Sequence, residues 1–167
     1  MMRYIVMAIV TVLTCLDLST AQARTPYEPE SLAGLPGVVV VVETITSEAQ
    51  ADGLSEEAIQ EAVEGILQSS GIRIFIESKT LPVSSNPWLY VQPNIGKGGP
   101  YYFYNISLRL IQKVSSVHGR KDTMAATTWE GNTAGIVNNT ELRDVILDVT
   151  ESWAKIFAND FLSVNPR

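Results

Sequence analysis

The spacing of apolar and polar residues predicts a helix, a sharp stop and a buried strand between residues 54 and 76. Apolar side chains fall on one helical face, at Ile59, Ala62, Val63, Ile66 and Leu67. Ser55 is placed to cap the free amides of the first turn, and Gly71 suits the left-handed conformation that ends a helix. The β-branched run 72–76 that follows predicts a short strand.

A second helical pattern follows Asn138 and continues almost to the C-terminus. Its apolar positions are Leu142, Val145, Ile146, Val149, Trp153, Ile156, Phe157 and Phe161. Asn138, with Glu141 three residues later, resembles a capping box, and Pro166 lies beyond the end. We expect this helix to lie across a sheet with its apolar stripe in the core. A groove for a partner is the alternative interpretation of the stripe.

The remaining apolar runs predict further strands, at 38–42, 88–92, 101–117 and 123–130. The first is a run of valines without alternation, typical of a central strand covered on both faces. The run 101–117 alternates, which indicates one covered face and one wet face. This alternation places the aromatic residues 101–104 on opposite faces and favours packing over base stacking. Turns are expected at 94–100, 118–122 and 131–135.

Together these elements predict an α+β fold. We expect a mixed, largely antiparallel sheet with the element order βαββββα and two long helices packed on one face. Residues 24–36 contain three prolines and show no periodicity, so they predict an extended N-terminal arm. A single α+β domain over residues 37–165 follows the arm.

The first 23 residues have the order of a secretory signal. Arg3 precedes an apolar run, and Ala21-Gln22-Ala23 offers the small residues of a cleavage site. We predict cleavage after Ala23 and a periplasmic or secreted protein. A membrane-spanning helix is the other interpretation, but it needs roughly 20 apolar residues, and Asp17 interrupts a run that is already too short.

Lipoprotein processing at Cys15 is a further alternative for the same segment. The residues Val12-Leu13-Thr14-Cys15 resemble a lipobox, although Thr14 stands where Gly, Ala or Ser is usual. Lipidation would hold the protein to a membrane through Cys15, whereas cleavage after Ala23 would release it.

Cleavage after Ala23 also removes the only cysteine, Cys15. Disulfides, thiolate metal sites and a cysteine nucleophile are then excluded. The net charge stays at −6, because Arg3 and Asp17 cancel. An acidic chain of this kind repels phosphate backbones, so we expect no nucleic-acid partner.

His118 is the only histidine, so every mechanism that needs a histidine base depends on it. Asp122 is close enough in sequence to orient it, and a small hydrolase using this pair is one alternative function. No serine stands in a nucleophile-elbow context, however, and Arg120 and Lys121 oppose the imidazolium that such catalysis forms. One histidine with scattered carboxylates also lacks the spacing of a metal site. We therefore expect no catalytic residue, no metal and no cofactor.

The segment around Trp129 is the strongest candidate for contact with a ligand or partner. A tryptophan at a strand end, beside an acid and two glycines, offers a large contact area with one polar handle. The candidate contact residues are Thr128, Trp129, Glu130 and Asn132. The alternative is that Trp129 closes the open end of the core.

Several short motifs resemble those of a group of small exported bacterial proteins of unknown function. They are the signal segment, the strand Gly37 to Glu43, Leu54-Ser55-Glu56, Ser70-Gly71-Ile72, Leu89-Tyr90-Val91, Thr128-Trp129-Glu130 and Asn165-Pro166. The order of elements is also similar to the N-terminal domain of the periplasmic Tol translocation protein and to the curli secretion lipoprotein. This resemblance implies an envelope-associated, non-enzymatic role and supplies no catalytic residues.

The leading hypothesis is therefore an exported, non-enzymatic binding or envelope-assembly module. Its partner is expected to be an envelope protein or a small ligand, and the mature chain is expected to lack a transmembrane span. The alternatives are the small hydrolase using His118 and Asp122 and the lipoprotein anchored at Cys15. The identity of the ligand, the strand order and the oligomeric state do not follow from the sequence.

Overall fold

The computed structural model describes residues 29–76, 86–115 and 123–166. Within them one sheet holds four strands in the order β1-β2-β3-β4. Their bounds are β1 Val39–Val42, β2 Trp88–Gly98, β3 Tyr101–Ser115 and β4 Thr123–Asn138. β1 runs parallel to β2, and the other neighbours are antiparallel. This mixed, largely antiparallel sheet confirms the predicted α+β fold.

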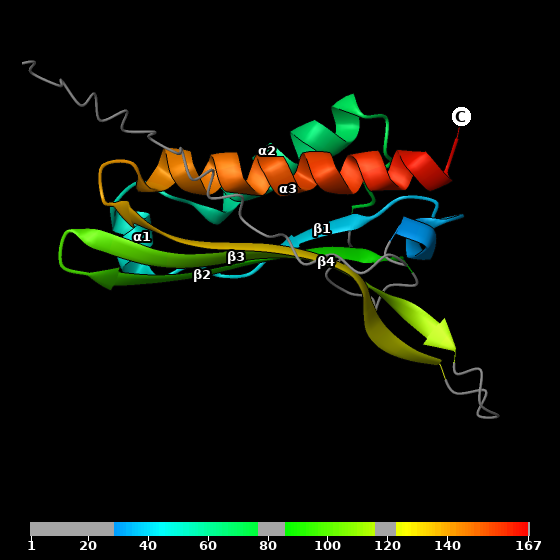
Figure 1. The fold of residues 1–167 in the computed structure, drawn as a ribbon, viewed down its shortest axis with the longest axis horizontal. Coiled ribbons are helices and arrows are strands. Elements are labelled where there is room, and N and C mark those ends of the chain that lie inside the picture. The colour runs from blue at the N-terminus through cyan, green and yellow to red at the C-terminus, as the bar shows by residue number, and fades with distance from the viewer. Residues whose placement is uncertain (1–28, 77–85, 116–122, 167) are drawn as a thin grey trace, which may run out of the picture.

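Two long helices, α2 (Glu56–Ser69) and α3 (Leu142–Val164), pack against each other on one face of the sheet (Figure 1). Ile59 of α2 and Trp153 of α3 are buried, and Ile66 and Val149 pack against the same core. Both apolar stripes therefore face the sheet, as the spacing predicts. The short helices η1 (Pro29–Leu32) and α1 (Ser47–Ala51) complete the described elements.

Local signals set both ends of α2 where the sequence predicts them. The Ser55 hydroxyl accepts a hydrogen bond from the backbone N–H of Ala58 at 3.1 Å, which satisfies one free amide of the first turn. Gly71 takes a φ of 70°, and the N–H of Ile72 then donates to the carbonyl of Leu67 at 2.9 Å. Residues next to the helix in sequence therefore cap both of its ends.

The region around β1 differs from the prediction of a central strand followed by a strand at 72–76. Among the described residues, β1 pairs along its length with β2 alone, and the segment after α2 forms a single parallel bridge between Val38 and Ile74. The chain then leaves the sheet, since Ile76 is 98% exposed. Pro93 of β2 lies just past the end of β1. Its missing backbone N–H therefore removes no hydrogen bond from the β1–β2 ladder.

β4 also differs from the prediction, because it continues through the glycines that were expected to form a loop. A Cβ added at Gly131 would lie 2.2 Å from the ring of Trp153, and one at Gly135 would lie 2.5 Å from the Tyr104 hydroxyl oxygen. These glycines leave room for side chains on the covered face rather than making a turn. The real turn between β2 and β3 is Gly99-Pro100, where Gly99 has a φ of 62°.

Residues 29–36 pack on the domain, although they were expected to belong to an extended arm. Leu32 of η1 is fully buried in the core. The Ser31 hydroxyl donates to the carbonyl of Thr128 at 2.8 Å, and the Asn165 amide donates to the carbonyl of Leu32 at 2.9 Å. η1 therefore joins β4 to the end of α3.

Candidate functional site: the open face of the sheet

The two faces of the sheet differ in what covers them. On the face under α2 and α3, Tyr102, Ile106, Leu108 and Leu110 of β3 are all fully buried. The opposite face, here called the open face, has no helix of the described residues drawn over it (Figure 1). Its residues alternate with those of the core and include Trp88, Tyr90, Gln92, Asn94, Phe103, Asn105, Arg109, Glu130, Asn132, Ala134 and Ile136.

An apolar patch lies on the open face at the end of the sheet nearest the β2–β3 turn. We define it as Tyr101, Phe103 and Ile136, whose exposed fractions are 51%, 54% and 65%. Phe103 and Ile136 are partners in the β3–β4 register. The Phe103 ring lies over Gly98, because a Cβ added there would be 2.7 Å from the ring. Exposed large apolar side chains that gather in this way mark a surface for interaction.

A row of polar residues, the polar row, crosses the open face further from the β2–β3 turn than the apolar patch. We define it as Glu43, Tyr90, Gln92 and Arg109. The Arg109 guanidinium donates to the Gln92 amide oxygen at 2.6 Å and lies 5.6 Å from the centre of the Tyr90 ring. Burial, followed by the charge of Glu43, raises the pKa of the Tyr90 hydroxyl above its ordinary value. Tyr90 therefore stays a neutral hydrogen-bonding group.

Three buried polar atoms on this side of the sheet have no hydrogen-bond partner among the described residues. They are Glu43 Oε2, Trp88 Nε1 and Arg109 Nε. A buried polar group without a partner costs about 1–3 kcal/mol. Among the described residues, the unpaired buried atoms of this side thus gather in and beside the polar row.

Acidic side chains are exposed on the helical layer. Glu57 and Glu61 of α2 and Asp144 and Asp148 of α3 all lie at the surface. The apolar patch contains no charged residue, and Glu130 is the exposed acid of β4 on the open face. The apolar patch thus offers aromatic and aliphatic groups without charge, as in protein interface cores, while the charged Glu43, Arg109 and Glu130 of the open face lie outside it.

Trp129, the central candidate of the sequence analysis, lies on the covered face and not at the surface. It is 1% exposed, and its ring meets Trp153 and Phe157 edge-on at centroid distances of 6.3 and 5.0 Å. Its indole N–H donates to the Asp160 carboxylate at 2.8 Å. Period-two alternation within β4 points the Trp129 ring into the core, in agreement with the interpretation that gives Trp129 a role in the core.

The other candidate residues divide between the sheet edge and the open face. Thr128 is the extra residue of a bulge opposite Leu110 and Ile111, and its hydroxyl accepts a hydrogen bond from the Gln112 amide at 2.7 Å. Glu130 and Asn132 are exposed on the open face. The structure therefore separates Trp129 from Glu130 and Asn132, whose partners across the β3–β4 register are Arg109 and Ser107.

The residues of the alternative functions lie outside the described residues. His118 and Asp122 fall in 116–122, and Cys15 falls in 1–28. Within the described ranges no group of three or more His, Cys, Asp or Glu side chains is arranged to hold a metal ion. None of the helices in 29–76, 86–115 and 123–166 combines the length and hydropathy of a membrane span.

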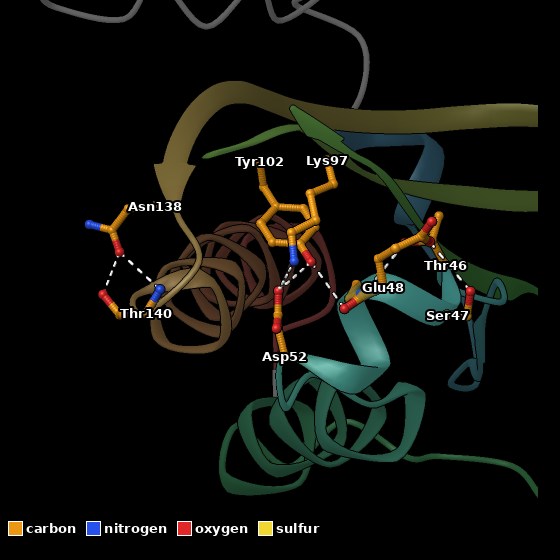
Figure 2. A network of polar contacts seen from close by, with 9 residues as sticks. Thr46, Ser47, Glu48, Asp52, Lys97, Tyr102, Asn138 and Thr140 are labelled. Carbon is orange, nitrogen blue, oxygen red and sulfur yellow. Dashed lines mark hydrogen bonds and ion pairs between the residues drawn. The ribbon is translucent and has the colours of Figure 1, made fainter. Parts of the chain in front are cut away.

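A polar network at the β2–β3 turn holds α1 to the sheet (Figure 2). The Tyr102 hydroxyl points at the Asp52 carboxylate, 2.6 Å away, and at the carbonyl of Glu48, 3.0 Å away. The Lys97 ammonium donates to the same Asp52 oxygen at 2.6 Å and lies 5.1 Å from the Tyr102 ring centre. The sequence analysis missed α1, whose start Thr46 caps by accepting from Ala49 N–H.

This network shifts the pKa of each of its three titratable groups. Hydrogen bonds from Lys97 and then Tyr102 lower the pKa of Asp52 below its ordinary 3.8. The bond to Asp52 raises the pKa of Lys97 above 10.5. Burial, with the bond to Asp52, raises the pKa of Tyr102 above 10.0. All three groups keep their ordinary neutral-pH forms, so the network is a structural clamp rather than a proton-transfer site.

Two cavities lie beside β1, and the side chains that line them do not form a catalytic cluster. One of about 470 Å³ is bounded by β1, α2 and residues 74–76. Another of about 380 Å³ lies past the end of β1 and is lined by Glu43, Thr44, Thr46, Pro93, Asn94, Ile95 and Gly96. Glu43 links the second cavity to the polar row.

Comparison with known proteins places the chain near two solved structures. No family model and no curated protein matches it. A minor lipoprotein from Acinetobacter baumannii is 11% identical, with 78% of this chain and 94% of that chain covered at a TM-score of 0.37. A PelC variant dodecamer from Paraburkholderia phytofirmans is 16% identical, with 80% and 92% covered at a TM-score of 0.43. At these TM-scores neither likeness assigns a function, a partner or an assembly to this chain.

Proposed function

We propose that this chain is an exported, non-enzymatic module of the bacterial cell envelope that binds another envelope protein on the open face of its sheet. The observation that carries the proposal is the exposed apolar patch of Tyr101, Phe103 and Ile136. The patch lies on a sheet face that no described helix covers. The signal pattern of residues 1–23 supports export, with cleavage after Ala23.

The chemistry of the open face favours a neutral protein surface with an apolar centre as its partner. Phe103 and Ile136 offer adjacent apolar side chains, and Asn105, two residues along β3 from Phe103, offers an amide beside them. Charged groups are depleted at interface cores because their desolvation is costly. A nucleic acid is disfavoured by the net charge of −6.

The polar row gives the same surface a means of specificity. Its four side chains are half-buried, and their exposed parts offer carboxylate, hydroxyl, amide and guanidinium groups that a partner must match. A wrong partner that buries these exposed groups without matching them loses about 1–3 kcal/mol for each hydrogen bond left unmade. Affinity thus comes from the apolar patch and discrimination from the polar row.

Site-specific cross-linking in the native envelope tests the proposal. A photo-reactive amino acid replaces Asn105, which is exposed on the open face, and Glu61, which is exposed on the outer side of α2, serves as the matched control position. We expect Asn105 to link to one defined envelope protein and Glu61 not to do so. We also expect Phe103→Ser to lower the Asn105 yield at least about tenfold, since truncation of an aromatic hot spot costs about 2 kcal/mol or more.

Equal linking from Glu61, or an Asn105 product that Phe103→Ser leaves unchanged, would contradict binding on the open face. An activity assay tests the non-enzymatic part of the proposal. Turnover by the purified protein that His118→Ala abolishes would show that the protein is an enzyme. The mass of the mature N-terminus distinguishes cleavage after Ala23 from lipidation at Cys15, with Cys15→Ser as the control.

A further inference from the structure

One edge of the sheet, along β4, presents backbone groups that no described residue pairs. The N–H of Asn139 donates to the carbonyl of Pro100 at 3.0 Å. In an antiparallel ladder, residues alternate between bonding to the neighbouring strand and pointing away from it. The odd residues of β4 therefore bond to β3, and the even ones direct both backbone groups to the outside. These outward residues are Glu130, Asn132, Ala134 and Ile136.

Described residues protect the ends of this edge but not its middle. At one end the Ser31 hydroxyl of η1 donates to the carbonyl of Thr128 at 2.8 Å. At the other end the carbonyl of Asn138 accepts from the N–H of Glu141 at 3.2 Å. Between them β4 has neither proline nor lysine, the residues that normally keep edge strands apart. The four outward residues are all exposed.

The predicted cleavage after Ala23 would leave a segment too short to pair along the whole of this edge. Cleavage after Ala23 leaves the five residues 24–28 before the described Pro29, and Pro26 among them has no N–H to donate. Five extended residues span at most about 17 Å, whereas the stretch 130–136 with both flanks takes about 30 Å. A strand of another chain is therefore the better occupant.

We propose that two copies of this chain pair antiparallel through β4, about a two-fold axis at Thr133. In this register Glu130 of one copy faces Ile136 of the other, and Asn132 faces Ala134. Each outward N–H and carbonyl of the four residues gains a partner. No two like charges face each other, because Glu130 is the only charged residue of the stretch.

The covered side of the edge also suits a second copy. The same register places Gly131 opposite Gly135 of the other copy, so neither position brings a side chain of its own, and the rings of Trp153 and Tyr104 already fill the space over these glycines within each copy. Thr133 lies at the axis, where its hydroxyl already accepts a hydrogen bond from the Trp153 indole at 2.9 Å. Because the axis is perpendicular to the sheet, the two open faces join into one continuous surface with α3 of each copy on the other side.

The mass of the purified protein in solution, measured by light scattering, tests this pairing. We expect the wild-type chain to have twice the mass of Ala134→Pro. Proline at 134 removes an outward N–H and leaves every β3–β4 hydrogen bond in place, so the fold tolerates it. Ala134→Ser is the matched control and should remain a dimer. Ile136→Lys places a charge on the edge and is the second variant, for the case that Ala134→Pro does not fold. We expect it to have half the mass of the wild type.

A disulfide experiment tests the register. A mixture of Asn132→Cys and Ala134→Cys chains should link on oxidation, because hydrogen-bonded partners lie about 5.5 Å apart between Cα atoms. Met124→Cys, exposed on β4 outside the stretch, is the control and should not link. A monomeric wild type, or an oligomer that persists in both Ala134→Pro and Ile136→Lys, would overturn the proposal. Neither result bears on the envelope partner of the open face, since no partner is present.

Discussion

The covered and open faces of the same sheet are built from alternate residues of the same strands. On the covered face Tyr102 is fully buried, whereas its neighbour Phe103 on the open face is 54% exposed. Likewise Trp129 is buried against α3, while Glu130 beside it is exposed. The covered face is sealed by helices that the sequence specifies locally. The open face retains exposed apolar side chains, together with buried polar atoms that no described residue pairs.

This difference separates stability from binding along a single strand. Substitutions on the covered face remove packing or create clashes, and their cost appears in the free energy of unfolding. Substitutions on the open face change little in the isolated fold, because surface positions usually lie within about 0.5 kcal/mol of neutral. The following changes test that separation.

The largest effect is expected for Trp153→Ala on the covered face. Trp153 is 2% exposed, packs edge-on against Trp129 at 6.3 Å and donates to the Thr133 hydroxyl at 2.9 Å. Its loss should lower the free energy of unfolding by about 3–5 kcal/mol. Urea denaturation measures this directly. If Trp153→Ala lowered the free energy of unfolding by less than the open-face substitutions do, the two faces would not differ in their contribution to stability.

A matched glycine pair should separate the faces at the next level. Gly131→Ala places a methyl group 2.2 Å from the Trp153 ring and should destabilise the fold by about 1–3 kcal/mol. Gly96→Ala meets nothing within 4 Å and should be neutral or stabilising by up to about 1 kcal/mol. Thermal unfolding of the two variants compares them. Equal melting temperatures would show that α3 does not seat on Gly131 as described.

Tyr102→Phe should have a smaller effect, of about 1 kcal/mol, because it keeps the buried ring and removes one hydroxyl. The lost group is the donor that lies between Asp52 and the carbonyl of Glu48. Hydrogen exchange of the α1 amides should speed up while that of α3 stays unchanged. Slower exchange in α1, or uniform acceleration everywhere, would contradict a clamp local to α1.

The same clamp predicts how stability depends on pH. Because the folded pKa of Asp52 is lowered from 3.8, its stabilising contribution is present above that value and is lost as the pH falls through the folded pKa. Because the folded pKa of Lys97 is raised from 10.5, its contribution is present below that value and is lost as the pH rises through the folded pKa. The stability difference between wild type and Asp52→Asn should thus be flat from about pH 5 to pH 9 and shrink at both extremes. A difference that grows in acid would reverse the assigned sign.

Those parts of the fold that local signals specify could be predicted from the sequence. Ser55, Gly71 and the apolar spacing of α2 sit close together in the chain, and the structure places them as expected. The alternation of β3 also gave the correct separation of Tyr102 from Phe103. Short-range geometry alone decides these features.

The rest depends on contacts between distant residues. Gly131 and Gly135 resemble turn residues until Trp153 and Tyr104 are seen to occupy the space above them. With a loop expected there, Ile136 could not be placed beside Phe103, so the apolar patch was missed. The sequence left open whether Trp129 contacts a ligand or closes the core, since only the full β4 strand fixes the face to which it points.

The most direct test combines stability and binding in one variant, Phe103→Ser. Its melting temperature should fall by no more than about 2 °C, while cross-linking of the envelope partner from position 105 should fall at least about tenfold. A variant that unfolds as readily as Trp153→Ala, or one that retains the cross-linked partner, would contradict the assignment of the open face to binding.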